Sequence, residues 1–291
     1  MPAFPELPSR RTLLAAALCA PALSACSAVG AFNAVVKSED GARTLATDLA
    51  YGPDPRQTLD IYGPPGAGGR KPVVIFIYGG SWNSGRRQDY AFVGKALAAQ
   101  GVVAVVIDYR LVPQVRFPGF VEDAARATAW VKANIAAHGG DPDRVFVMGH
   151  SAGAYNAAMV SVTPTYLRAA GLRGRAFRGF IGLAGPYDFL PLDVSATREA
   201  FGQAPDLRAT QPVLVAQSSA PPSLLLHGRD DDTVYPRNSE ALARVLSGKG
   251  VPATLKLYDG VGHAGILVAL ANGFRDKAPV LADTMAFIRS H

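Results

Sequence analysis

The stretch Arg144-Val-Phe-Val-Met-Gly-His-Ser-Ala-Gly-Ala-Tyr-Asn-Ala-Ala-Met159 decides how the rest of the chain is interpreted. Its apolar start is typical of a buried strand, and its alanine-rich end is typical of a helix. Between them lies Gly149-His-Ser-Ala-Gly153, a G-x-S-x-G pattern. A strand that turns at once into a helix strains the central residue and lifts the serine oxygen clear of the sheet. This context favours a serine nucleophile, Ser151, over a chance match between common residues.

Length and composition limit the class of protein. The 291 residues fit one large α/β domain or two small ones, and 49% hydrophobic against 18% charged residues excludes general disorder. The net charge of +6 is modest for this length, and no run of lysine and arginine is present. We therefore expect no nucleic-acid partner.

The first 25 residues differ in kind from the rest. Arg10 and Arg11 precede a short apolar stretch over residues 13–23, which suits a signal peptide better than a membrane-spanning helix. The following Leu23-Ser-Ala-Cys26 resembles a bacterial lipobox. The resemblance implies cleavage before Cys26, lipid attachment to Cys26, and an exported protein anchored on the periplasmic side of a bacterial membrane. The paired arginines resemble a twin-arginine signal, with general export as the alternative. A buried N-terminal helix is the alternative for the whole segment.

The domain organisation follows from this leader. Residues 1–25 are the predicted signal peptide, and residues 26–42, which are small and polar without a clear period, are the predicted lipidated N-terminus and tether. Residues 43–291 are the predicted catalytic domain. The two cysteines are Cys19 and Cys26, so the mature domain would contain no disulfide and would depend on its core for stability.

Strand and helix patterns alternate through the predicted domain. Strands are expected near residues 45–49, 58–62, 73–77, 102–107, 145–148, 180–183, 224–226 and 254–258. Helices are expected near residues 87–100, 118–138, 152–160, 238–246 and 280–290, with a small cap insertion at residues 186–220. This alternation predicts an α/β fold with a mostly parallel central sheet and helices on both faces. Ligands bind such sheets at the carboxyl ends of the strands.

A serine hydroxyl needs a base, and histidine serves best near neutral pH. His150 lies inside the elbow and is expected to point away from Ser151, whereas His138, His227 and His291 end a helix, a strand and the chain. His263 is expected on a glycine-rich loop straight after the last predicted strand, where a base is needed.

The base in turn needs an acid that orients its ring. Three consecutive aspartates, residues 230–232, follow the strand at residues 224–226. A metal site is the alternative interpretation of such a cluster, but three consecutive residues converge poorly on one ion and no calcium-binding loop is present. We therefore expect catalysis without a metal or other cofactor.

The order of serine, acid and histidine resembles that of the α/β-hydrolase superfamily, and specifically its bacterial carboxylesterase and arylformamidase-like (kynurenine formamidase-like) esterase branch. The resemblance extends over nearly all of residues 45–291. It is carried by Leu59-Asp-Ile-Tyr62, Tyr78-Gly-Gly-Ser-Trp82, Asp108-Tyr-Arg-Leu111, Gly140-Asp-Pro-Asp-Arg-Val145, Gly185-Pro-Tyr-Asp188 and His227-Gly-Arg-Asp-Asp-Asp-Thr-Val234.

The resemblance implies a role for each site residue. Ser151 is the nucleophile, His263 the base and Asp231 the acid. The backbone N–H groups of Gly80, Ser81 and Ala152 form the oxyanion hole. The family's usual histidine before the two glycines is replaced by Tyr78, which affects loop anchoring more than chemistry because backbone groups hold the oxyanion.

The sequence thus predicts a serine hydrolase that cleaves a small-molecule carboxylic ester through an acyl-enzyme. An arylformamidase or other amide-type hydrolase is the alternative within enzymes, and a non-catalytic binding protein on the same fold is the alternative outside them. Four arginines between residues 168 and 178 either contact lipid headgroups or form an ordinary solvated surface.

Overall fold

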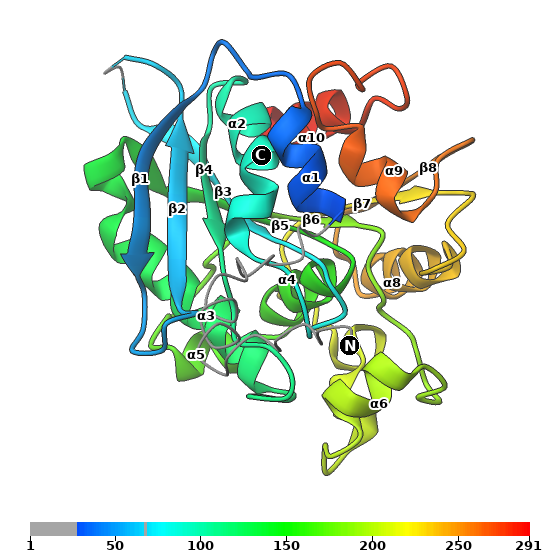
Figure 1. Ribbon diagram of the computed structural model, residues 1–291. Coiled ribbons are helices and arrows are strands. Elements are labelled where there is room, and N and C mark those ends of the chain that lie inside the picture. Colours follow the sequence, from blue (N-terminus) through cyan, green and yellow to red (C-terminus); the bar gives the residue numbers. More distant parts are fainter. Residues whose placement is uncertain (1–27, 67–68) are drawn as a thin grey trace, which may run out of the picture.

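The structure, a computed structural model, describes residues 28–66 and 69–291. The predicted signal peptide and Cys26 lie outside these residues. Within them, eight strands form one sheet with the order β1-β2-β4-β3-β5-β6-β7-β8 (Figure 1). The strands are β1 (Arg43–Ala50), β2 (Thr58–Gly63), β3 (Lys71–Ile77), β4 (Val103–Ile107), β5 (Gly140–His150), β6 (Gly179–Leu183), β7 (Ser223–Gly228) and β8 (Ala253–Tyr258).

The helices lie on both faces of the sheet and at its carboxyl edge. The α-helices are α1 (Ala28–Val35), α2 (Ala91–Ala98), α3 (Gly119–Asn134), α4 (Ala152–Val162), α5 (Thr165–Ala169), α6 (Ser195–Phe201), α7 (Pro212–Val215), α8 (Arg237–Gly248), α9 (His263–Val268) and α10 (Val280–Ser290). Three 3₁₀ helices are described, η1 (Arg87–Tyr90), η2 (Ile135–His138) and η3 (Leu207–Thr210).

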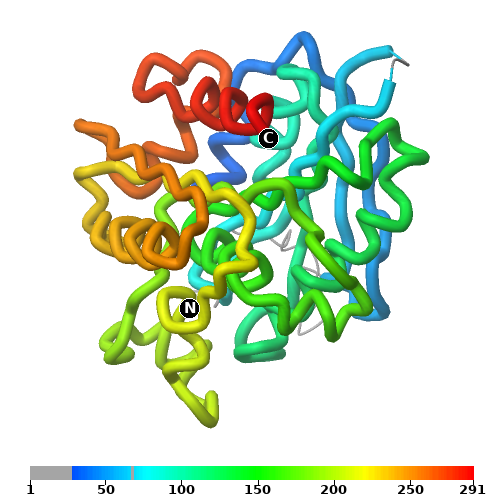
Figure 2. Tube along the Cα trace, turned by 180° about the vertical axis from the view of Figure 1, so that it is seen from behind, coloured from blue at the N-terminus to red at the C-terminus, as the bar shows by residue number. Residues whose placement is uncertain are grey.

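The sheet is mostly parallel, with antiparallel pairing only where β2 meets β1 and β4. Strand β3 lies inside the sheet, between β4 and β5. Its five residues Val73 to Ile77 are therefore fully buried, as expected for a mostly β-branched run covered on both faces. Helix α2 packs on one face together with α1 and α10, and α3, α4 and α8 cover the other (Figures 1 and 2). The predicted α/β fold is therefore confirmed.

The strand register brings several loops to one edge of the sheet. Ile77, the last residue of β3, pairs with Gly149, and His150 at the end of β5 pairs with Leu183 at the end of β6. The chain therefore leaves β3, β5 and β6 at the same level. The cap insertion, which contains α6, lies at this carboxyl edge (Figure 1).

The prediction of a tether is wrong over the described part of that segment, because residues 28–35 form helix α1, which packs on the domain. The Phe32 ring contacts Phe92 and Phe274 edge-on, at centroid distances of 5.2 and 5.3 Å. The Asn33 side chain donates to the Gln88 carbonyl and accepts from the Phe92 N–H. These partners are distant in sequence, so the local pattern of small residues gave no sign of the helix.

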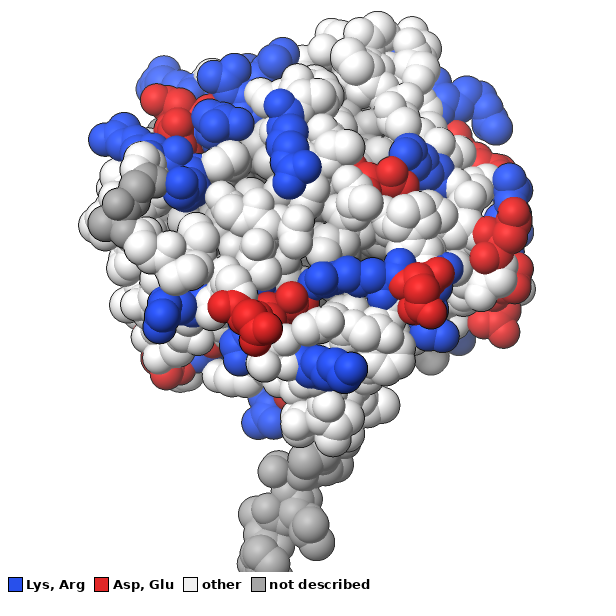
Figure 3. All heavy atoms as spheres, turned by 90° about the horizontal axis from the view of Figure 1, so that it is seen from above, with Lys and Arg blue, Asp and Glu red and all other residues white. Residues whose placement is uncertain are grey.

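Charges on the surface are mixed in sign. The face seen from above in Figure 3 carries lysine and arginine side chains beside aspartate and glutamate side chains. On this face, the basic side chains are thus interspersed with acidic ones. Among the described residues, no helix combines the length and apolar character that crossing a bilayer requires.

An aromatic cluster joins the cap to the body of the domain. Phe201, at the end of α6, is fully buried, and its ring lies 4.8 Å from Trp82 and 5.1 Å from Tyr155, measured between centroids. A backbone hydrogen bond from the Phe117 N–H to the Ala200 carbonyl lies beside it. The cap is therefore held by core packing as well as by its two chain connections.

We predict that Phe201→Ala lowers the free energy of unfolding by about 3–5 kcal/mol, because it removes a fully buried ring and leaves a cavity. Urea denaturation followed by fluorescence measures the change. Leu214→Ala in the same insertion is the matched control, since Leu214 is 47% exposed and its truncation should change the value by less than about 0.5 kcal/mol. Equal effects of the two variants would contradict the proposed anchoring.

Candidate active site

Ser151 lies at the junction of β5 and α4 in a backbone conformation that few residues adopt. Its φ and ψ are 54° and −124°. A side chain at Gly153 would place its Cβ 2.1 Å from the Ile77 carbonyl oxygen, and one at Gly149 would meet the Gly153 oxygen at 2.3 Å. Both glycines are therefore required for helix α4 to start so close to the sheet. This is the strained elbow that the G-x-S-x-G pattern predicted.

The structure brings the three predicted side chains, Ser151, His263 and Asp231, into one hydrogen-bonded chain. The Ser151 Oγ lies 2.9 Å from His263 Nε2, and His263 Nδ1 lies 2.7 Å from Asp231 Oδ2. His263 is the first residue of the short helix α9, rather than part of the expected glycine-rich loop. Because Nδ1 donates to the carboxylate, Nε2 is left to accept the proton of the serine hydroxyl.

Asp231 is buried, whereas its neighbours Asp230 and Asp232 are exposed. Its Oδ1 accepts hydrogen bonds from the N–H groups of Thr233 and Val234, at 3.0 and 2.8 Å. Burial alone would raise the pKa of Asp231. The hydrogen bonds from two histidines and from Val234 outweigh burial and hold its pKa well below the usual range, so this carboxylate stays charged.

His150 is closer to the site than the sequence indicated. Its side chain was expected to point away from Ser151, but its Nε2 donates to the His263 carbonyl at 3.0 Å, and the two rings lie 4.9 Å apart between centroids. Burial, with the nearby His263 ring as a second cause, lowers the pKa of His150 to about 3. His150 is therefore a neutral residue that contacts the backbone of the candidate base.

The loop after β3 is a compact turn with three consecutive residues at positive φ. The φ values are 123° at Gly80, 52° at Ser81 and 60° at Trp82, and the Gly80 carbonyl accepts from the N–H groups of Asn83 and Ser84. A Cβ at Gly80 would lie 2.3 Å from the Ser84 oxygen. Ala152 is the first residue of α4, where N–H groups have no partner within the helix.

Tyr78 anchors this loop from below. Burial, followed by the charge of Asp108, raises the pKa of Tyr78 well above its ordinary value, so its phenol stays protonated. It donates to Asp108 Oδ1 at 2.7 Å and accepts from Arg56 Nη2 at 2.7 Å. The Tyr109 hydroxyl donates to the Tyr78 carbonyl at 3.1 Å. Tyr78, which stands where the family usually has a histidine, thus holds the loop through these hydrogen bonds.

Trp82 fixes the other end of the loop by packing. Its ring is buried against Phe120 and Phe201, and its indole N–H donates to Asn156 Oδ1 at 3.2 Å. Asn156 belongs to α4, so the loop is tied to the helix that begins beside Ser151.

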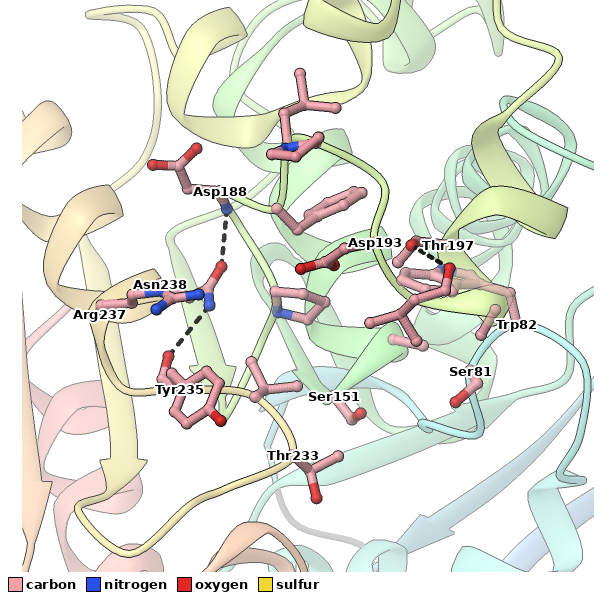
Figure 4. A pocket seen from close by; sticks show the side chains of 18 residues that line it. Ser81, Trp82, Ser151, Asp188, Asp193, Thr197, Thr233, Tyr235, Arg237 and Asn238 are labelled. Atoms are coloured by element: carbon pink, nitrogen blue, oxygen red, sulfur yellow. Dashed lines mark hydrogen bonds between the residues drawn. The ribbon is translucent and has the colours of Figure 1, made fainter.

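A cavity of about 400 Å³ opens above Ser151 (Figure 4). Ser81, Trp82 and Ala152 line it on the side of the loop after β3, and the cap and the loop after β7 supply the remaining walls. The walls combine apolar side chains with the charged Asp188, Asp193 and Arg237. This mixture suits a ligand that has both an apolar and a polar part.

Asn238 holds two walls of the cavity together and was not predicted. Its Oδ1 accepts from the N–H groups of Tyr187 and Asp188 at the start of the cap, both at 2.9 Å. Its Nδ2 donates to the Tyr235 carbonyl at 3.1 Å (Figure 4). No sequence pattern marks it, because the two N–H groups that donate to its Oδ1 lie about fifty residues away in the chain.

Metal chemistry has no evident ligand set in the part of the chain that the structure describes. Within residues 28–66 and 69–291, no group of three or more His, Cys, Asp or Glu side chains is arranged to hold an ion. Cys26, the predicted lipidation site, lies outside this part.

The sheet order, the strained serine and the cap define an α/β-hydrolase fold. Solved structures with this fold are similar to the chain. Esterase B from Lactobacillus rhamnosis, in a tributyrin phosphonate-inhibited form, has a TM-score of 0.79 at 22% identity, with 90% of each chain covered. A truncated carbohydrate esterase from gut microbiota has a TM-score of 0.75 at 22% identity, covering 88% of this chain and 98% of that one.

Within this class, residues 59–246 match the BD-FAE family, and the chain belongs to that family. Isoprenylcysteine alpha-carbonyl methylesterase ICME of Arabidopsis thaliana is 30% identical over 250 residues, which are 78% of this chain and 58% of that protein. Esterase LipQ of Mycobacterium tuberculosis is 33% identical over 224 residues, 70% of this chain and 53% of that protein. The chain thus spans little more than half the length of these relatives.

We predict that His150 makes the protein less stable in acid. Its folded pKa of about 3 lies below the ordinary value of 6.5, so the unfolded chain binds the proton more tightly. The free energy of unfolding should therefore fall as the pH drops from about 6.5 towards 3, by at most ~1.4 kcal/mol per pH unit from this group.

Urea denaturation at a series of pH values tests this, with His150→Gln as the comparison. Glutamine retains an N–H donor for the His263 carbonyl but does not titrate. Protonation of Asp231 also lowers the free energy of unfolding in acid, but it does so equally in the wild type and in the His150→Gln variant. The wild-type curve should therefore be steeper, and parallel curves would show that His150 does not titrate on unfolding.

Proposed function

We propose that this protein is a serine hydrolase that cleaves carboxylic esters. The observation that carries the proposal is the hydrogen-bonded chain Ser151–His263–Asp231, whose serine lines a cavity. The esterase names of the relatives support the same reaction class. Membership of one family adds to the site geometry but does not replace it, since a fold hosts several chemistries.

In the proposed reaction, Ser151 attacks the ester carbonyl carbon while His263 Nε2 takes the hydroxyl proton. The tetrahedral intermediate collapses when His263 returns this proton to the departing alcohol, which leaves an acyl group on Ser151. Water then attacks the acyl carbonyl with His263 again as the base, and the acid is released. Asp231 stays charged and stabilises the imidazolium in each half-reaction.

The negative oxygen that forms during attack needs hydrogen-bond donors. We propose the backbone N–H groups of Gly80, Ser81 and Ala152 for this role. Ser81 and Ala152 line the same cavity as Ser151, and Ala152 opens helix α4. The anchors of Tyr78 and Trp82 hold this loop in place before substrate arrives, which makes the donors effective because they need not reorganise.

We predict that Ser151→Ala abolishes ester hydrolysis and leaves the fold intact, because the nucleophile is lost and the backbone donors remain. A panel of p-nitrophenyl esters of rising chain length, with an aryl formamide beside it, measures activity and tests the amide-type alternative. A fluorophosphonate probe should label wild-type protein stoichiometrically at Ser151. Labelling at another serine would overturn the assignment, and a protein that neither reacts nor hydrolyses would favour a binding role.

We also propose that Cys26 carries the lipid of an exported, membrane-anchored protein, as the lipobox-like Leu23-Ser-Ala-Cys26 indicates. Helix α1 starts at Ala28, so a single residue separates Cys26 from an element that packs on the domain. The catalytic domain would then sit directly on the bilayer rather than on a long tether.

We predict that mass spectrometry of the membrane fraction finds an N-terminal peptide that begins at Cys26 with diacylglycerol attached. Two or three acyl chains would hold the protein firmly, whereas one would not. Cys26→Ser should release the protein from the membrane. A wild-type mature protein that begins at another residue would end this proposal.

A further inference from the structure

His227 is a fully buried histidine that contacts the same oxygen of Asp231 as His263 does. It lies near the end of β7, and its two ring nitrogens both have partners. Its Nδ1 lies 2.7 Å from the Ser239 Oγ on α8. Its Nε2 lies 2.7 Å from the Val234 carbonyl oxygen and 3.1 Å from Asp231 Oδ2.

These partners fix which nitrogen carries the hydrogen. A carbonyl oxygen only accepts, so the Nε2 of His227 must be the donor towards Val234, and the same N–H is shared with Asp231. When only Nε2 carries a hydrogen, Nδ1 is an acceptor, and the Ser239 hydroxyl donates to it. Ser239 is itself fully buried, so this bond is shielded from bulk solvent.

The shared atom is Asp231 Oδ2. It accepts from His263 Nδ1 at 2.7 Å and from His227 Nε2 at 3.1 Å. The other oxygen, Oδ1, is held by two backbone N–H groups. The carboxylate therefore has a fixed rotation, and the oxygen facing His263 is also the one that His227 contacts.

We propose that His227 is a positioning residue, which acts through Asp231 to orient and tune the base His263, and that Ser239 holds His227 in the required tautomer. This inference rests on the proposed esterase function. It extends the chain of hydrogen bonds to Ser239–His227–Asp231–His263–Ser151, which joins α8 to the elbow.

The arrangement has a consequence for the pH dependence of activity. A donor from His227 withdraws negative charge from Asp231 Oδ2, so its removal leaves Asp231 a stronger partner for protonated His263. The base then keeps its proton to higher pH, and the acidic limb of kcat/KM moves upward.

Few other charged groups contribute to this limb. His150, at the end of β5, interacts electrostatically with both His227 and His263 and stays neutral. Asp230, Asp232 and Arg229 belong to the same loop as Asp231 but are exposed. Arg229 is in addition paired with Asp259 at 2.8 Å.

The experiment compares wild type with His227→Leu, His227→Gln and Ser239→Ala in the full-length protein. Hydrolysis of p-nitrophenyl acetate is followed from pH 5 to 9, and kcat is expressed per site labelled by a fluorophosphonate, which removes any effect of misfolded protein. Asp231→Asn is the positive control, and Asp230→Asn is the negative control because Asp230 is exposed.

For His227→Leu we expect kcat to fall by about tenfold with little change in KM, and the acidic limb to move up by about half a pH unit. His227→Gln retains a donor and should recover most of the rate and the wild-type limb. Ser239→Ala should shift the limb in the same direction by a smaller amount, because the ring then loses only its tautomer control.

Two results would overturn the proposal. One is a His227→Leu protein whose labelled sites turn over at the wild-type rate with the wild-type pH profile. The other, decisive if the leucine variant does not fold, is a wild-type profile in Ser239→Ala together with a glutamine variant as slow as Asp231→Asn. Failure of the proposed function itself is a different outcome, since wild type would then neither be labelled nor hydrolyse the ester.

Discussion

The site depends on one close approach, that of helix α4 to the end of strand β3. The first turn of α4 passes so near the Ile77 carbonyl that only a glycine fits at position 153. This contact places Ser151 at the carboxyl edge of the sheet and gives it a positive φ. The loops after β3, β7 and β8 begin at the same edge of the sheet, because the parallel strands that precede them end there together. The geometry of the candidate triad is therefore a consequence of strand register more than of any local sequence around His263 or Asp231.

A second constraint is a group of buried charges beneath the loop after β3. Arg87 is buried and ion-paired with Asp60 at 2.8 Å and with Asp108 at 2.6 Å, and it also contacts Asp48. Asp108 in turn accepts from Tyr78, which starts the loop. A charge removed from water in this way is stable only when its partners remain, so loss of one member is strongly destabilising. The network therefore holds the loop after β3 in one position. Residues 80–82 keep their positive φ values because Tyr78 and Trp82, which support the loop at its two ends, cannot shift independently.

Much of the fold could be predicted from the sequence because its signals are local. The apolar runs at β3 and β4 could only be buried strands, and the G-x-S-x-G pattern identified the turn at Ser151. The parts that were missed depend on distant partners. Helix α1 is stabilised by contacts of Phe32 with Phe92 and Phe274. The positions of His150 and Asn238 follow from hydrogen bonds to residues 113 and about fifty positions away. No periodicity reports such contacts, so the sequence and its family resemblance predicted the members of the candidate triad but not these supporting residues.

Three histidines are linked by hydrogen bonds, because His150 contacts the backbone of His263, and His227 and His263 both contact Asp231. Their surroundings explain why only one of them is suited to the proposed role of base. His150 and His227 are buried. The Nε2 hydrogen of His150 goes to the His263 carbonyl, and that of His227 is shared between the Val234 carbonyl and Asp231 Oδ2. His263 differs from both, because its side chain is 18% exposed and its Nε2 lies 2.9 Å from the Ser151 Oγ. In the proposed reaction, proton transfer is confined to the one ring that contacts the serine hydroxyl, while His150 contacts the backbone of that ring's residue and His227 contacts its acid.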